Sequence, residues 1–369
     1  MAPYLYTQVF NYTILILIII AFLQCESKSI FEDGTVSLTS GFGVLFSMAL
    51  ILFMGLRPVG FAFGDMIVYN AVFQQYARSP NLFVKDSDWL FYNLMSIFSK
   101  FTSAKVFFLF CSFCYVGSFW LAMRRMFKSY YYIPFLVILS MFTFWNYGVN
   151  GIRNGMGAAI FVLALTYVDR LPVAILLAFV AMGIHSSVYL MTAAAGAAFF
   201  YKNSKHYLIF WFLCIVMSLV AGGAIQSALA GMGIFGDDER FTSYLTSNEE
   251  VQRQQGMVVK TGFRWDFLIY SAVPVAVGYY FIFKQKFQDE YYHWIYNIYL
   301  LTNSFWVLII RAAYSNRFAQ ISWFIMPVVL IYPFVKARFW ENQENKLGYA
   351  LLVFYVFTFV YNVVPMWLA

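Results

Sequence analysis

Apolar residues occur along this chain in long solid runs that are separated by short polar stretches. The runs extend over roughly 15 to 20 residues, close to the length with which an α-helix crosses a bilayer. Barrel strands alternate apolar and polar residues over about ten positions, so a membrane barrel is excluded. The pattern therefore predicts an all-α polytopic transmembrane helical bundle of about 11–12 membrane helices. We expect the helices near residues 9–23, 41–56, 104–123, 131–145, 155–168, 171–184, 188–201, 207–230, 267–283, 292–310, 318–335 and 348–365.

Two of the expected helices, 171–184 and 188–201, are shorter than the roughly 17 residues that a crossing normally needs. They meet at His185-Ser186-Ser187, so they form either two short crossings or a re-entrant hairpin. The first expected helix follows no basic segment and precedes no small-residue cleavage site, so we expect it to be retained. We treat residues 1–369 as a single integral membrane domain.

The composition supports this prediction and excludes several classes of protein. The chain is 62% hydrophobic and 11% charged, with a mean hydropathy of +0.69, whereas about a quarter of the residues of a soluble domain are charged. No Lys/Arg run suggests nucleic-acid binding. Cys111 and Cys114 form a CSFC motif without a second ligand pair, so we interpret all four cysteines, Cys25 and Cys214 included, as packing residues. We expect no cofactor.

Short basic loops predict the orientation of the bundle. If the helices alternate, these loops fall on one side, which the positive-inside rule makes cytoplasmic. They carry Arg124, Arg125, Lys128, Arg170, Lys202, Lys205, Lys284, Lys286, Lys336, Arg338 and Lys346. The other side receives two longer outer loops, about 57–103 and 231–266. It holds eight arginines against four lysines, whereas the inner side holds four arginines against eight lysines.

The outer arginines indicate an anionic ligand, because a guanidinium fork binds phosphate or carboxylate oxygens bidentately and stays charged when partly buried. Four of them lie at the ends of expected helices, where ionisable residues are candidates for function. They are Arg57, Arg153, Arg311 and Arg317. The alternative for each is snorkelling toward lipid headgroups, which needs only a long side chain.

The segment RPVGFAFGDMIVYNAVF, residues 57–73, places Asp65 just outside the membrane and Tyr69 one helical turn later. A carboxylate at the mouth of a helical bundle is suited to act as a general base for a sugar hydroxyl. The alternative is that Asp65 caps a helix that begins near Met66.

The segment WNYGVNGIRNGMGAAIF, residues 145–161, brings Asn146, Asn150, Arg153 and Asn154 together at an expected helix start. Amide side chains, an arginine and a helix N-terminus together favour an anion or diphosphate site. The glycines alone have a different interpretation, the close packing of membrane helices.

The segment GIHSSVYL places His185 between two apolar runs. A histidine in this position is suited to orient a hydroxyl, to act as a base or to donate to a phosphate oxygen. The alternative is a hydrogen bond between helices.

The outer segment GDDERFTSYLTSNEEVQRQQG, residues 236–256, combines aromatic and charged residues, as does the Arg264-Trp265-Asp266 sequence that follows it. Tyr244 and Arg264 would suit contacts with sugar faces. The three consecutive acidic residues 237–239 cannot easily point at one ion, so we expect no metal site.

These motifs, in this order, resemble the EpsG family of Wzy-like exopolysaccharide polymerases. The resemblance covers roughly residues 40–335. It rests on RPVGFAFGDMIVY, GIRNGMGAAIF, GIHSSVYL, ERFTSYL and SNRFAQISWFIMP. The chain departs from the family in having Phe-Ala-Phe-Gly before Asp65, where the family usually has a tighter Gly-Thr-Asp-like approach.

The resemblance implies a GT-C-like membrane glycosyltransferase that joins polyprenyl-diphosphate-linked oligosaccharide repeat units into exopolysaccharide, O-antigen or capsule. The site would face the periplasm or exterior of a bacterial cytoplasmic (inner) membrane, in a multi-pass protein. Its partners would be the lipid-linked donor and acceptor, the bilayer, a flippase and a chain-length regulator, with no nucleic acid. Arg153, Arg311 and Arg317 would bind the departing diphosphate, and Asp65 or His185 would be the base.

Two other classes also use charged residues within a membrane. A flippase or transporter for lipid-linked sugars would be expected to show repeated halves, and we find no convincing internal repeat. A membrane O-acyltransferase would use an intramembrane histidine with an acyl donor from the cytoplasmic side, whereas we expect His185 on the outer side.

Overall fold

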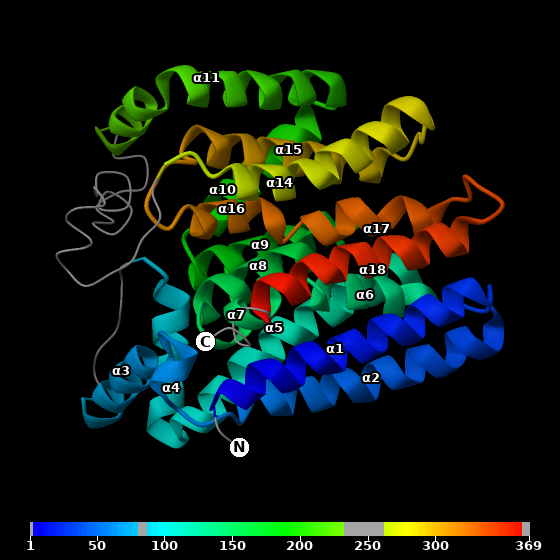
Figure 1. The fold of residues 1–369 in the computed structure, drawn as a ribbon. Helices are drawn as coiled ribbons and strands as arrows, with labels where there is room; N and C mark the ends of the chain where they lie inside the picture. Colours follow the sequence, from blue (N-terminus) through cyan, green and yellow to red (C-terminus); the bar gives the residue numbers. More distant parts are fainter. Residues whose placement is uncertain (1–2, 80–86, 232–261, 364–369) are drawn as a thin grey trace. The chain divides into compact units, whose positions relative to one another are not determined.

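The computed structural model describes residues 3–79, 87–231 and 262–363, and every regular element in these ranges is a helix (Figure 1). This confirms the prediction of a polytopic helical membrane bundle, since each expected membrane helix coincides with one or two observed helices. The contacts divide the chain into two compact units, which we describe separately. Unit 1 is residues 1–188 and 334–369, and unit 2 is residues 189–333.

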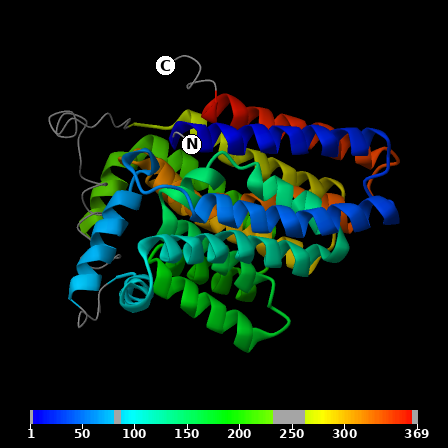
Figure 2. The same ribbon diagram turned by 90° about the horizontal axis from the view of Figure 1, so that it is seen from below.

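Unit 1 combines long helices that lie alongside one another with shorter helices at their ends. Helix α1 packs on α18, α2 on α5, and α8 on both α5 and α9. Figure 2 shows α3 crossing the ends of the long helices. The elements are α1 (Pro3–Glu26), α2 (Asp33–Gly55), η1 (Phe61–Phe63), α3 (Met66–Arg78), α4 (Trp89–Phe101), α5 (Ala104–Phe127), η2 (Lys128–Tyr131), α6 (Tyr132–Leu139), α7 (Phe144–Val149), α8 (Ile152–Leu165), α9 (Leu171–Ile184) and α18 (Gln343–Asn362).

Unit 2 is built around α16 and α17, which form the most deeply buried of the long apolar stretches. Helix α15 packs against α11, α14 and α16. Buried tyrosines of α15 bond to carbonyl oxygens of neighbouring helices; Tyr299, for example, donates to Ser271 O at 2.7 Å. The elements are α10 (Val188–Phe200), α11 (Ser204–Gly231), α14 (Trp265–Tyr279), η3 (Tyr280–Lys284), α15 (Glu290–Leu308), α16 (Ser315–Trp323) and α17 (Met326–Lys336).

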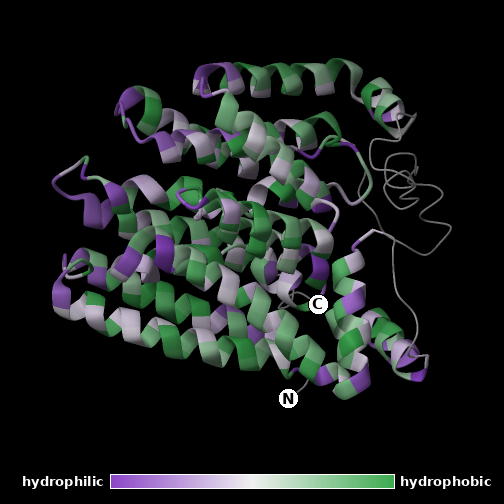
Figure 3. Ribbon diagram, turned by 180° about the vertical axis from the view of Figure 1, so that it is seen from behind, coloured by the Kyte–Doolittle hydropathy of each residue, from purple (hydrophilic) through white to green (hydrophobic). Residues whose placement is uncertain are grey.

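Several of the long helices carry exposed apolar side chains. Among the described residues, six helical stretches are long and apolar enough to cross a membrane, and three further apolar helices are shorter. Val220 of α11 is 82% exposed and Leu45 of α2 is 68% exposed, whereas nearly every residue of α8 is buried. Figure 3 shows hydrophobic residues along the long helices and hydrophilic residues gathered near their ends. Such exposure suits a bilayer and would be unfavourable in water.

The helix expected over 131–145 is instead two helices, α6 and α7, separated by residues 140–143. A break leaves backbone carbonyls without helical partners, which is costly in an apolar environment. Side chains of α18 supply those partners: Thr358 donates to Ser140 O at 2.5 Å and Asn362 to Phe142 O at 3.0 Å. The break therefore depends on a helix far away in the sequence.

The segment 57–103, expected as an outer loop, contains η1, α3 and α4 among its described residues. Helix α3 begins at Met66, as the sequence indicates. Its buried residues Met66, Tyr69, Phe73 and Tyr76 recur every three or four positions, so they form one face against the bundle. An amphipathic period within a largely polar segment explains why helices form there.

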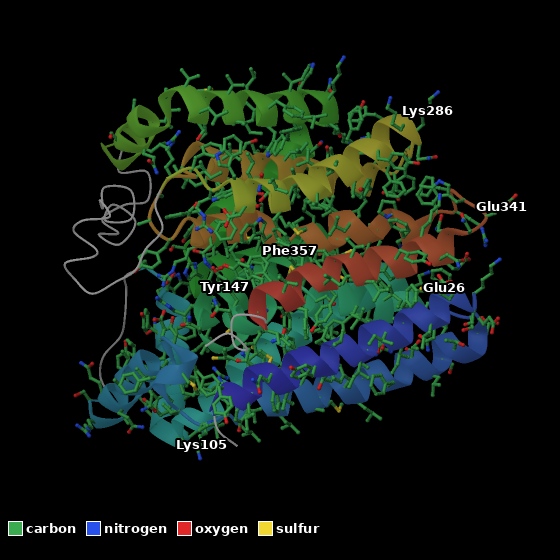
Figure 4. All side chains as sticks on the ribbon, viewed as in Figure 1. Glu26, Lys105, Tyr147, Lys286, Glu341 and Phe357 are labelled. Atoms are coloured by element: carbon green, nitrogen blue, oxygen red, sulfur yellow. The ribbon has the colours of Figure 1, made fainter. Side chains whose placement is uncertain are left out.

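The basic loops of unit 1 meet at one end. Arg125 at the end of α5 donates to Asp169 at 2.7 Å and to Thr166 O at 2.8 Å, and Lys336 donates to Met126 O at 2.5 Å. Figure 4 shows Glu341 near this end and Lys105 at the opposite one. Helix α9 runs from the Arg125 end of unit 1 to the end that holds Arg153, which is the path expected of a short crossing.

Candidate functional site

An ion pair is buried at the end of unit 1 opposite the basic loops. Arg153, in the first turn of α8, donates through Nη1 to Asp88 Oδ2 at 2.6 Å. The side chains are only 13% and 6% exposed. Removing two charges from water costs several kcal/mol for each ion, so such a pair persists only when further hydrogen bonds support it.

Two tyrosines provide that support for Arg153. Its Nε donates to the Tyr69 hydroxyl at 3.1 Å, and Nη1 donates also to the Tyr92 hydroxyl at 2.9 Å. The guanidinium carbon lies 5.5 Å from the centre of the Tyr69 ring and 5.2 Å from that of Tyr92. None of the described residues accepts a hydrogen bond from Nη2. The guanidinium is thus held rigidly and keeps one donor for a ligand.

Asp88 connects three segments of unit 1. It lies at the N-cap position of α4 with φ of 61°, a left-handed conformation that Asp and Asn tolerate better than most residues. Its Oδ1 accepts from the backbone N–H of Ser186 at 2.7 Å, while Oδ2 binds Arg153. One carboxylate therefore joins the start of α4, the first turn of α8 and the turn that contains His185.

The tautomer of a neutral His185 ring follows from hydrogen bonds within its own turn. The backbone N–H of Ser187 donates to His185 Nδ1 at 3.1 Å, and the Ser187 hydroxyl lies 2.8 Å from the same nitrogen. A nitrogen that accepts from an N–H carries no proton, so the neutral ring carries its proton on Nε2. In this arrangement His185 Nδ1 is occupied by Ser187 and is poorly suited to act as a base.

Asp65 is held near Arg153 through its backbone. Its N–H donates to Asn150 Oδ1 at 2.8 Å, and Asn150 Nδ2 donates to Asn146 at 3.2 Å. Gly64 has φ of 58°, and a methyl group there would lie 2.3 Å from Asn150 Oδ1, so only glycine permits this approach. The Asp65 side chain is exposed and makes no capping hydrogen bond to α3. Its carboxylate is therefore available to a ligand.

Arg57 is buried in unit 1 and is 1% exposed. It donates to Val149 O at 2.8 Å and to Met54 O, and it lies over the Phe63 ring. Burial lowers the pKa of Arg57 to about 10, which leaves the group protonated at neutral pH. The carbonyls it binds belong to the ends of α2 and α7, where a cation is favourable. In this geometry Arg57 joins two helix ends, and contact with a substrate stays a prediction.

The remaining candidates lie elsewhere. In unit 2, Arg264 pairs with Asp266 at 2.6 Å, Arg317 lies over the Tyr314 ring, and Arg311 lies between α15 and α16. Asn154 follows Arg153 in α8 and is partly exposed. Tyr244 lies outside the described residues. No group of three or more His, Cys, Asp or Glu side chains within the described ranges is placed to hold a metal ion.

Asp88 and Tyr92 are site residues that the sequence motifs did not predict. Both belong to the segment expected as a loop. The available signal was an acidic residue directly before an amphipathic run, the typical position of a helix N-cap. Their contact with Arg153, 65 positions away for Asp88, has no signature in a single sequence.

The fold and the site together define a polytopic α-helical membrane protein. At one end of its first unit lies a buried arginine, Arg153, whose Nε and Nη1 are hydrogen-bonded within the described residues and whose Nη2 is not. The model of the EpsG family matches residues 41–366, nearly the whole chain. The chain therefore belongs to the EpsG family, as its motifs indicate, and is related to exopolysaccharide polymerases. No curated protein and no solved structure shows significant similarity to it.

Proposed function

We propose that this protein is a membrane glycosyltransferase that polymerises polyprenyl-diphosphate-linked oligosaccharide repeat units. The observation that carries the proposal is Arg153, whose Nε and Nη1 are bound by Asp88, Tyr69 and Tyr92 while Nη2 has no acceptor among the described residues. A fixed cation of this kind suits the negative charge that develops on a departing diphosphate.

The reaction makes one bond and breaks one. A hydroxyl of the acceptor sugar attacks the anomeric carbon of the donor, and a glycosidic bond forms. The bond from that carbon to the diphosphate oxygen breaks, and its electron pair leaves with the diphosphate. Asp65 takes the hydroxyl proton, because its carboxylate is exposed, whereas His185 Nδ1 already accepts from the Ser187 N–H.

The bilayer supplies both substrates. Their polyprenyl chains remain among the lipids, and the site at the end of unit 1 receives the sugars and the diphosphate. We place this end on the outer face of a bacterial cytoplasmic membrane, since the basic loops lie at the other end. A flippase would deliver the repeat units, and a chain-length regulator would act on the product.

Incubating the purified protein in nanodiscs with lipid-linked repeat units and no nucleotide sugar tests the proposal. We expect a ladder of chain lengths on a gel, because the donor already carries its activating diphosphate. Empty nanodiscs are the control. Absence of a ladder, from folded protein that binds the lipid donor, would contradict the proposed reaction.

Cysteine labelling tests which end faces outward. The two positions are Lys105→Cys and Glu341→Cys, each exposed and at opposite ends of unit 1 (Figure 4), in a chain whose native cysteines are replaced by alanine. We expect an impermeant maleimide to label residue 105 in intact cells and residue 341 only after permeabilisation. The reverse pattern would refute the assigned orientation.

A further inference from the structure

Helix α11 of unit 2 has a kink that brings a second arginine against its backbone. Ala221 has non-helical dihedral angles, with φ of −131° and ψ of 19°. The next residue is Gly222, where an added methyl group would lie 2.9 Å from Arg311 Nε and 3.6 Å from Ser218 Oγ. Because glycine has no side chain, the Arg311 guanidinium and the Ser218 hydroxyl can both lie close to the backbone of residue 222.

The polar atoms near this kink lack partners. Arg311 Nε, Ser218 Oγ and Gln226 Nε2 are buried, and none makes a hydrogen bond within the part of the chain that the structure describes. Ser218 is 0% exposed and Gln226 is 8% exposed. A buried donor without an acceptor costs about 1–3 kcal/mol, so native proteins rarely leave several together unless a water, ion or ligand satisfies them.

The polar atoms at the kink favour an anionic ligand. The Arg311 guanidinium is a donor, the Ser218 hydroxyl can donate, and none of the described carboxylates pairs with Arg311. A guanidinium that has a hydroxyl donor beside it and no carboxylate partner among the described residues is suited to phosphate oxygens. The surface of α11 before the kink is apolar and exposed, with Val216 at 56% and Val220 at 82%. A ligand here would have a phosphate head beside an apolar chain.

We infer that Arg311 and Ser218 form a phosphate-binding site at the α11 kink for the diphosphate of a lipid-linked substrate. The site belongs entirely to unit 2 and shares no residue with the Arg153 network. The choice of substrate rests on the proposed function, because a polymerase binds two lipid-linked molecules, a donor and an acceptor. The headgroup of a bilayer phospholipid offers the same chemistry, and the experiment separates the two.

The test compares two adjacent glycines. Gly222→Ala forces Arg311 away from α11, whereas Gly223→Ala is its matched control, because a methyl group on Gly223 meets nothing within 4 Å. Both changes raise helix propensity equally. The probe is radiolabelled farnesyl diphosphate, with protein in phosphatidylcholine nanodiscs, and every protein carries Arg153→Ala, which removes the other proposed diphosphate site. We expect Gly222→Ala, Arg311→Gln and Ser218→Ala each to weaken binding about tenfold or more, and Gly223→Ala to leave it unchanged.

Competition identifies the occupant. Displacement by unlabelled farnesyl diphosphate, but not by dioleoyl phosphatidylglycerol, supports the substrate; equal displacement by the phospholipid would overturn that assignment in favour of a headgroup. Unchanged binding by folded Arg311→Gln and Gly222→Ala would overturn the site itself. This assay measures binding and not polymerisation, so the two proposals can fail separately. If binding depends on Gly222 but no ladder of chain lengths forms, polymerisation is refuted and the anion site is retained.

Discussion

Replacing Arg153 by alanine is expected to lower the rate of chain elongation about 10²–10³-fold, the usual effect of removing one preorganised group that stabilises developing negative charge. The substitution removes the Nη2 donor proposed to face the diphosphate. Arg153→Lys should retain part of the rate, because an ammonium keeps the charge but loses the rigid fork held by Tyr69 and Tyr92.

The measurement is the initial rate of ladder formation in nanodiscs at saturating lipid-linked donor. Arg125→Ala is the matched control, since Arg125 also pairs with an aspartate, Asp169, but at the opposite end of unit 1. It should elongate chains at the wild-type rate. A second control is Arg153→Ala with Asp88→Asn, which leaves no unpaired carboxylate. If either Arg153 variant elongates at the wild-type rate, Arg153 does not act on the leaving group.

Asp88→Asn is expected to destabilise the protein by about 3–5 kcal/mol, the cost of leaving one partner of a buried ion pair uncompensated. The asparagine has the same shape and tolerates the left-handed backbone, so the change isolates the charge. We also expect slower elongation, because Arg153 and the His185 turn lose their shared anchor. The fraction unfolded in an SDS titration measures the first effect.

A double-mutant cycle separates stability from catalysis. Asp88→Asn combined with Arg153→Gln removes both charges, so it should recover much of the lost stability and none of the activity. Asp169→Asn is the control, since Asp169 is exposed and a surface ion pair contributes little to stability. Equal stability of Asp88→Asn and Asp169→Asn would show that the Asp88 carboxylate is not a structural anchor.

The membrane helices follow from the sequence because solid apolar runs have few alternatives in lipid. The division at residues 140–143 does not, since it depends on Thr358 and Asn362. Likewise, the position of Arg153 at a helix start was predictable from its glycine and asparagine neighbours. Its carboxylate partner was not, because Asp88 reaches it only after α3 and α4 fold against α8. Local pattern determines the elements, and contacts between distant segments complete the site.

The pairing of α18 with the break between α6 and α7 has a consequence for how unit 1 is made in the cell. Asn362 follows Phe142 by 220 positions, and the whole of unit 2 is synthesised between them. The carbonyl groups of Ser140 and Phe142 therefore lack their final partners, Thr358 and Asn362, until the helices of unit 2 have been synthesised. The first unit is completed last, so assembly of the candidate site's own unit is a late event of biogenesis.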